Sequence, residues 1–283
     1  MNEIRNLAVE EISDCVARLC ILANTRLPES VRELLDAAQD QEHYHPAKHA
    51  LSMIRQNAEM ALHQQTPICQ DTGMAIVYAE VGQDVHLVGG TLEEAIQKGV
   101  ARGYSEGYLR KSIVADPIRR KNTDDNTPAI LHTRLVAGNQ IKLTMAPKGF
   151  GSENMSRLAM LNPSEGIQGV MDFVLETVRL AGANPCPPMV LGVGVGGNFE
   201  RVAELAKEAL VEQRKGPHPD PFYATMEDTL LHRINSLGIG PQGFGGRSTA
   251  LAVRIKAFPT HIAGFPVAVN IGCHVNRHAS EML

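Results

Sequence analysis

The first part of the chain has the hydrophobic spacing of helices. Apolar side chains recur three or four positions apart from Ile4 to Cys20, and two more runs with this period follow Pro28 and Pro46. A repeat of this length gives a helix one apolar face, and proline is compatible with a first helical turn. The pattern therefore predicts a helical N-terminal region at residues 1–65.

From residue 66 onward, short apolar runs alternate with turns that contain Gly and Pro. Such runs are typical of strands, while longer segments between them keep the helical period. We expect strands at 75–81, 131–136, 141–145, 189–193, 251–255 and 266–271, and helices at 92–101, 166–181, 199–211 and 221–237. This order predicts an α/β fold (mixed α+β), in which the helical layer packs on one integrated mixed-sheet domain at 66–283.

Composition excludes several classes of protein. With 283 residues, 43% of them apolar, the chain can bury a large core. A net charge of −4 without a basic run argues against nucleic-acid binding. No apolar stretch is long enough to cross a bilayer, and the first residues lack the apolar segment of a signal peptide. We therefore expect a cytoplasmic protein without a membrane partner.

The five cysteines fall into two groups. Their odd number, without a secretion signal, argues against a disulfide framework. Cys15 and Cys20 follow the helical period, where cysteine behaves as a small buried apolar residue. Cys69, Cys186 and Cys273 stand instead at the edges of expected strands, in loops that can aim a side chain into a cleft.

The three loop cysteines are too far apart in sequence for a zinc ribbon. Three thiolates from distant loops suit a [4Fe–4S] cluster, in which one iron keeps an open position and can act as a Lewis acid. Their spacing alone is equally compatible with three unrelated thiols.

Four motifs, in this order along the chain, carry a family resemblance. They are ICQDTG at 68–73, KGFGSEN at 148–154, NPCPP at 184–188 and GIGPQG at 238–243. The chain resembles, over nearly its whole length, the N-terminal half of class I (iron–sulfur) fumarate hydratases and the related tartrate dehydratase α subunits. The resemblance implies that Cys69, Cys186 and Cys273 hold a [4Fe–4S] cluster whose open iron binds the hydroxyl and a carboxylate of the substrate.

A dicarboxylate also needs cations and oriented N–H groups around it. Lys148 and the turn that contains Gly149, Gly151 and Ser152 are expected to bind a carboxylate, with a short helix opening at Asn154. An ordinary glycine turn after a strand is the alternative. The family usually has a further glycine where this chain has a phenylalanine.

Arg110 matches the substrate-binding arginine of the family, and its planar fork suits a carboxylate. Gln70 and Asp71 directly follow Cys69, and the family uses this pair near the substrate. Asp71 is a catalytic candidate that could orient the substrate or transfer a proton, although Asp71-Thr72-Gly73 also has the composition of an Asx turn.

His261 is the second catalytic candidate. It precedes Cys273 as the active-site histidine of the family precedes its third cysteine. A near-neutral pKa suits an imidazole for hydrogen bonding or proton exchange with a ligand.

A glycine-rich segment offers a rival class. Residues 192–197 contain Gly-x-Gly-x-x-Gly between an expected strand and helix, the setting of a dinucleotide-binding turn. The helix then leads into Arg214-Lys215-Gly216-Pro217 and not into a second strand that ends in an acidic residue, so an NAD-dependent dehydrogenase is disfavoured. These glycines indicate close backbone packing. A non-enzymatic scaffold is a third class.

Among enzymes, hydration of fumarate to malate is our first choice, because segment 148–154 looks more like the fumarase version; tartrate dehydratase is the alternative. Single-chain class I fumarate hydratases continue well past the third cysteine, whereas ten residues follow Cys273 here, His274 to Leu283. The resemblance therefore implies a β subunit that completes the active site, and a hetero-oligomer.

Overall fold

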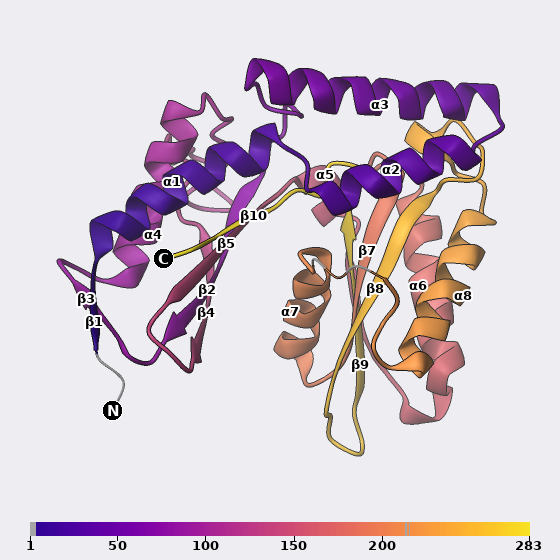
Figure 1. Cartoon of the computed structure of the whole chain (residues 1–283). Helices are drawn as coiled ribbons and strands as arrows, with labels where there is room; N and C mark the ends of the chain where they lie inside the picture. The colour runs from indigo at the N-terminus through magenta and orange to yellow at the C-terminus, as the bar shows by residue number, and fades with distance from the viewer. Residues whose placement is uncertain (1–3, 213, 215) are drawn as a thin grey trace. The chain divides into compact units, whose positions relative to one another are not determined.

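The computed structural model describes residues 4–212, 214 and 216–283 (Figure 1). Contacts divide the chain into two compact units. The first comprises the residues up to Pro28, Ala58–Phe150 and Arg277–Leu283, and the second comprises Glu29–Asn57 and Gly151–Asn276. Each unit combines helices with a sheet, so the α/β class is confirmed. The boundary expected at residue 65 falls inside the first unit.

The first unit is a four-stranded sheet with two helices packed on it. Its strand order is β10-β5-β2-β4; β2 pairs parallel with β4 and antiparallel with β5, and β10 is antiparallel to β5. Helices α1 and α4 lie side by side (Figure 1). The elements are β1 (Arg5–Ala8), α1 (Val9–Thr25), β2 (Met74–Gly82), β3 (Val85–Val88), α4 (Leu92–Glu106), β4 (Ile130–Val136), β5 (Ile141–Lys148) and β10 (Ala279–Met282).

Cys15 and Cys20 belong to the core of this unit. Both are 0% exposed, and the Cβ of Cys20 would lie 2.8 Å from a Cβ added at Gly103, so α1 and α4 approach closely there. Burial raises the pKa of the Cys15 thiol to about 12 and also raises the pKa of Cys20. The expected packing role of both is confirmed.

The second unit has a four-stranded sheet with helices on both faces. Its strand order is β6-β9-β7-β8, in which β7 pairs parallel with β8 and antiparallel with β9. Helix α7 covers one face, and α6 and α8 cover the other (Figure 1). The elements are α2 (Glu29–Gln41), the part of α3 (His45–Gln64) up to Asn57, β6 (Arg157–Leu161), α6 (Gly166–Ala181), β7 (Met189–Gly196), α7 (Phe199–Leu210), α8 (Pro221–Asn235), β8 (Ala250–Phe258) and β9 (Phe265–Gly272).

The glycines of β7 let α7 lie directly on the sheet. A Cβ at Gly192 would lie 2.0 Å from the carbonyl oxygen of Ala206, and one at Gly194 would lie 2.2 Å from that of Val202. Leu191 and the other large apolar residues of β7 point to the opposite face, into the core with α6 and α8. The close packing predicted for this segment is therefore confirmed.

All the strands and helices expected after residue 66 are present, with ends that differ by a few residues. The helical prediction is wrong at Arg5–Ala8, which form β1 and pair in parallel with β3. Its four residues are too few to show a period. None of the described helices is both long and apolar enough to span a membrane.

Candidate active site

The loop that carries Cys69 is held by hydrogen bonds from several segments of the first unit. Ile68 N donates to the carbonyl oxygen of Asn24 at 2.9 Å. Thr72 Oγ1 donates to the carbonyl oxygen of Arg110 at 3.2 Å and accepts from Arg110 N at 2.9 Å. The buried Tyr104 hydroxyl lies 2.9 Å from the carbonyl oxygens of both Thr72 and Gly73. The loop therefore has a defined conformation.

Asp71 accepts two backbone hydrogen bonds with its carboxylate. Oδ1 accepts from Gly73 N at 3.0 Å, which is the Asx turn considered as an alternative, and Oδ2 accepts from Phe150 N at 2.8 Å. The second bond holds the first residue of α5 (Phe150–Glu153). The sequence predicted that this helix opens at Asn154, but it starts earlier, at Phe150. The earlier start follows from the hydrogen bond between Phe150 N and the carboxylate of Asp71, a residue outside the segment.

Lys148 ends β5 beside the same loop. Residue Met74 of β2 pairs with Lys148, and a Cβ at Gly73 would lie 2.7 Å from the backbone of Lys148. The Lys148 side chain is buried, with Nζ 3.4 Å from the carbonyl oxygen of Gly149. A Cβ at Gly149 would lie 3.1 Å from Asp71 Oδ2. Lys148 and Gly149 therefore lie against the Cys69 loop.

The first unit thus brings together more than half of the candidate site residues. Cys69 is partly exposed, with Sγ 3.3 Å from Gln70 Oε1, and the Gln70 and Arg110 side chains are exposed. The residues that the structure gathers here are Cys69, Gln70, Asp71, Arg110, Lys148 and Gly149.

Two residues that the sequence did not single out also hold this loop. Asn126 is fully buried and donates from Nδ2 to the carbonyl oxygen of Gly73 at 3.2 Å, while its Oδ1 accepts from Ser112 N at 2.7 Å. Arg277 is buried and donates from Nη2 to the carbonyl oxygen of Asp71. Neither lies in a recognisable motif, so no local signal in the sequence could have revealed them.

In the second unit, strand pairing brings Cys186 and Cys273 to one edge of the sheet. Val190 near the start of β7 pairs with Gly272 at the end of β9, so the loops that carry the cysteines adjoin. His274 Nδ1 lies 2.8 Å from the carbonyl oxygen of Cys186. Cys186 has φ 53° and an exposed side chain, and Cys273 is partly exposed. The edge therefore presents two accessible thiols.

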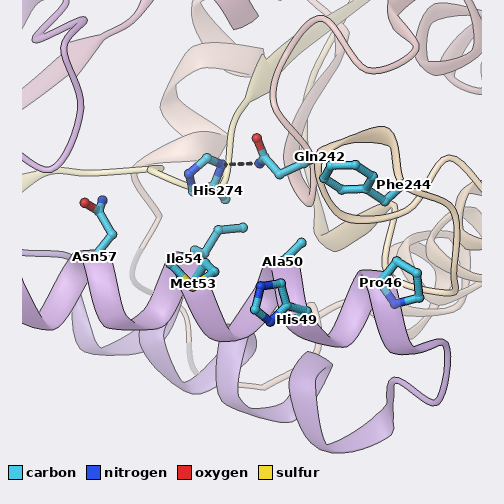
Figure 2. Close-up of a pocket in the computed structure, with 9 residues that line it drawn as sticks. All are labelled: Pro46, His49, Ala50, Met53, Ile54, Asn57, Gln242, Phe244 and His274. Atoms are coloured by element: carbon cyan, nitrogen blue, oxygen red, sulfur yellow. Dashed lines mark hydrogen bonds between the residues drawn. The ribbon is translucent and has the colours of Figure 1, made fainter.

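A cavity of about 530 Å³ lies beside His274 in the second unit (Figure 2). Gln242, from the fourth motif, donates from Nε2 to the carbonyl oxygen of Pro187 at 2.8 Å and contacts His274 Nδ1 at 3.2 Å. The opposite wall is α3, and its residues make the cavity largely apolar. The lining residues are Pro46, His49, Ala50, Met53, Ile54, Asn57, Gln242, Phe244 and His274.

Gly151 and Ser152 lie at the start of the second unit. Gly151 is exposed, whereas Ser152 is 5% exposed and its carbonyl oxygen accepts from Met155 N at 3.2 Å. The next residue, Glu153, forms an ion pair with Lys207 and accepts from Asn270 Nδ2 at 2.9 Å. These bonds fix the far side of the turn that Lys148 begins.

His261 lies far from Cys273 within the second unit. It is exposed in the turn before β9, where Ala263 N donates to His261 Nδ1 at 3.2 Å. Cys273 follows the other end of β9, Phe265–Gly272, and a strand of this length spans roughly 25 Å at about 3.3 Å per residue. The fold of this unit therefore does not bring these two candidates together.

The donor set fits iron–sulfur chemistry better than a hard-metal site. Within the described ranges, no group of three or more His, Cys, Asp or Glu side chains is arranged to hold a metal ion. Cys69, Cys186 and Cys273 form no disulfide among the described residues, lie on loops and are at least partly accessible, in contrast to the core thiols. Soft thiolate donors on loops are the ligands that iron–sulfur clusters use.

In the first unit, one loop thiol lies beside an anchored carboxylate and cations, and this is a combination that an enzyme site built from loops uses. The family model described as fumarate hydratase (Fumerase) matches residues 13–281. The chain therefore belongs to the fumarate hydratase (Fumerase) family, and the resemblance found in its motifs is confirmed.

Two curated relatives extend over nearly the whole chain. The putative L(+)-tartrate dehydratase subunit alpha of Methanocaldococcus jannaschii is 40% identical over 280 residues, which cover 96% of this chain and 98% of that protein. The L(+)-tartrate dehydratase subunit alpha of Escherichia coli O157:H7 is 30% identical over 279 residues, which cover 98% of this chain and 92% of that protein.

Proposed function

We propose that this chain is the α subunit of an iron–sulfur hydro-lyase that reversibly hydrates fumarate to malate. The observation that carries the proposal is the hydrogen-bonded loop of the first unit, which holds Cys69 beside Asp71, Arg110 and Lys148. A dicarboxylate needs this combination of cations and fixed polar groups close to a metal ligand. Membership of the fumarate hydratase family supports it.

In this proposal Cys69, Cys186 and Cys273 hold a [4Fe–4S] cluster. When bound, such a cluster supplies a Lewis acid that polarises the hydroxyl group lost as water. The exposed setting of Cys186 and the partly exposed settings of the other two thiols leave them accessible to iron.

The cations of the first unit bind the carboxylates. Arg110 has an anchored backbone and an exposed side chain, so its fork is available to a ligand. Lys148 brings a positive charge to the same loop, and the Gly149–Ser152 turn adds backbone N–H groups. A charge-assisted hydrogen bond of this kind contributes about 1.5–3 kcal/mol. Gln70, next to Cys69, completes this side of the pocket.

Asp71 and His261 are the candidates for proton transfer. Both Asp71 oxygens accept backbone N–H groups, so Asp71 is well oriented, but accepting a substrate proton would weaken one of these bonds. His261 and Cys273 lie beyond opposite ends of β9, so we infer that His261 acts in a site shared with another subunit.

We further propose that a β subunit supplies the remaining walls of the pocket. An open iron needs groups that face it and exclude bulk water. The names of the two relatives describe them as alpha subunits, which supports a heteromeric assembly for this chain.

L(+)-tartrate dehydration is the second candidate reaction. Both relatives carry that name, while the matching family carries the name fumarate hydratase. Both reactions remove water from a hydroxy dicarboxylate, so the same cluster and cations serve either one.

The deciding experiment is an anaerobic assay of the reconstituted chain, alone and co-expressed with its β subunit, against malate, fumarate and L(+)-tartrate. We expect a brown iron–sulfur protein with little activity alone and strong activity as the complex. The higher kcat/KM identifies the substrate. Nicotinamide binding without iron would overturn the proposal, and full activity of the isolated chain would overturn the shared-site part of it.

A further inference from the structure

Arg277 is a buried cation that has no carboxylate partner among the residues that the structure describes. It is 5% exposed, and Nη2 donates its hydrogen bond to a neutral acceptor, the carbonyl oxygen of Asp71. Nε and Nη1 are buried and have no hydrogen-bond partner in the part of the chain that the structure describes. A buried guanidinium is costly unless an anion compensates it, so this arrangement needs an explanation.

Arg214 shows how the same chain pairs a buried arginine elsewhere. Its side chain is 11% exposed, and Nη2 lies 2.6 and 2.8 Å from the two carboxylate oxygens of Glu227. Its Nε and Nη1, like those of Arg277, have no hydrogen-bond partner among the described residues, so the carboxylate is what distinguishes the two arginines. Arg277 has no such carboxylate among the described residues, and Asp71 cannot supply one freely because Gly73 N and Phe150 N already bond to both of its carboxylate oxygens. The contrast indicates that the counter-ion of Arg277 comes from outside the chain.

The position of Arg277 indicates where this anion binds. It bonds to the loop that presents Cys69 and follows Cys273 by four residues, so it belongs to the surroundings of the proposed cluster and substrate. We propose that Arg277 is a positioning residue that fixes the Cys69–Gly73 loop and binds an anion with its remaining N–H groups. The anion is a substrate carboxylate or the thiolate-ligated cluster, an assignment that rests on the proposed function.

An arginine is needed for this double task. Its planar fork can donate to the Asp71 carbonyl oxygen from one nitrogen and to an anion from the others, whereas the ammonium group of a lysine is a single point charge on a flexible stem. Arg277→Lys therefore keeps the charge and loses the geometry, and Arg277→Met keeps most of the volume and loses both.

The first test uses the full-length chain without a cluster. Arg277→Met should leave the Tm equal to or above that of the wild type, because it removes an uncompensated buried charge. The control Arg214→Met should lower the Tm, because it removes the arginine that forms two hydrogen bonds with the buried Glu227 carboxylate. Amide hydrogen exchange of Gly73 and Phe150, the two donors to Asp71, should accelerate at least tenfold in Arg277→Met and stay unchanged in Arg214→Met.

The second test identifies the anion. If it is a carboxylate, malate or L(+)-tartrate raises the Tm of the wild-type chain and of Arg214→Met, and not that of Arg277→Met or Arg277→Lys. If it is the cluster, Arg277→Met holds less iron after anaerobic reconstitution, or holds a cluster of more negative reduction potential, because a nearby cation stabilises the reduced form.

The proposal is overturned if Arg277→Met matches the wild type in loop exchange, in ligand-induced Tm shift and in iron content. It is also overturned if Arg277→Met loses as much Tm as Arg214→Met without a change in loop exchange. These outcomes are separable from failure of the proposed function. If the wild type binds no iron, the exchange and dicarboxylate measurements on the cluster-free chain still decide the role of Arg277.

Discussion

The two units position their loop cysteines by different physical means. In the first unit, the Cys69 loop is held by polar side chains from distant segments, including Tyr104, Asn126 and Arg277. In the second unit, Cys186 and Cys273 are brought together by the register of β7 and β9, and the main polar support is the contact of His274 with the Cys186 carbonyl oxygen.

Under the proposed function, this difference would separate binding of the substrate from retention of the cluster. The cations and the anchored carboxylate lie on the first unit with one cysteine, while the second unit contributes two cysteines and a largely apolar cavity. Changes to polar side chains of the first unit should therefore impair turnover, and changes to the sheet of the second unit should impair stability and iron content.

The largest effect is expected from the cysteines themselves. Cys69→Ser, Cys186→Ser and Cys273→Ser should each abolish retention of the cluster, because the proposed site has three thiolate ligands and each substitution leaves two. Cys15→Ser and Cys20→Ser should lower stability without removing iron, since both thiols are 0% exposed within the helical core. Iron and sulfide analysis after anaerobic reconstitution checks this, and a full cluster in any of the first three variants would contradict the ligand assignment.

The next effect tests the sheet of the second unit. Gly192→Ala would place a Cβ 2.0 Å from the carbonyl oxygen of Ala206, so α7 must move away from β7. We expect a loss of about 3 kcal/mol in the free energy of unfolding, the upper range for overpacking a core, and a lower iron content. Urea unfolding measures it. Gly264→Ala is the matched control, because its Cβ would meet no atom closer than 3.4 Å.

The sequence predicts a helix or strand only when its hydrophobic pattern extends over enough residues. Local patterns predicted α6, β2 and β7, because their periods extend over many residues. They missed β1, β3, β6 and β10, which are four or five residues long and exist through pairing with other strands.

The same limit applies to the candidate site. Separate motifs identified Cys69, Asp71 and Lys148, and the structure brings Lys148 to the Cys69 loop through its pairing with Met74. Arg277 carries no local signal, since only its burial and its bond to Asp71 set it apart. The sequence also predicted the strand between His261 and Cys273, but the family resemblance placed both residues in one site, although a strand of this length holds its two ends apart.

A smaller effect is expected for the cations of the first unit. Arg110→Ala or Lys148→Ala should leave the iron content unchanged and lower kcat/KM by a factor of about ten to a hundred or more, since each removes a charge-assisted hydrogen bond worth about 1.5–3 kcal/mol. Arg18→Ala, which removes an exposed ion pair with Glu281 on the same unit, is the control and should keep normal kinetics. Near-normal kcat/KM in both test variants would remove these residues from the site.

The smallest effect concerns pH and again distinguishes the two units. His278, beside Arg277 in the first unit, is 6% exposed, and neither ring nitrogen has a partner among the residues that the structure describes. Burial lowers the pKa of this imidazole from 6.5 to about 4. Between these two pH values, His278 is therefore neutral in the folded chain and protonated in the unfolded chain.

Between pH 6.5 and about 4 the unfolded state takes up a proton at this position and the native state does not. The free energy of unfolding should consequently fall as the pH falls through this window, by up to about 1.4 kcal/mol per pH unit from this residue. His278→Phe cannot take up the proton, so its stability should depend less steeply on pH, whereas the exposed His232→Gln, on α8 of the second unit, should behave like the wild type. Urea unfolding at pH 7, 6 and 5 provides the comparison.

If the wild type and His278→Phe lose stability in parallel, His278 is protonated in the folded chain and the acid sensitivity of the first unit has another source. If only the wild type is weakened, hydrogen exchange should show that the loss of stability begins around β10, next to the segment that holds the Cys69 loop.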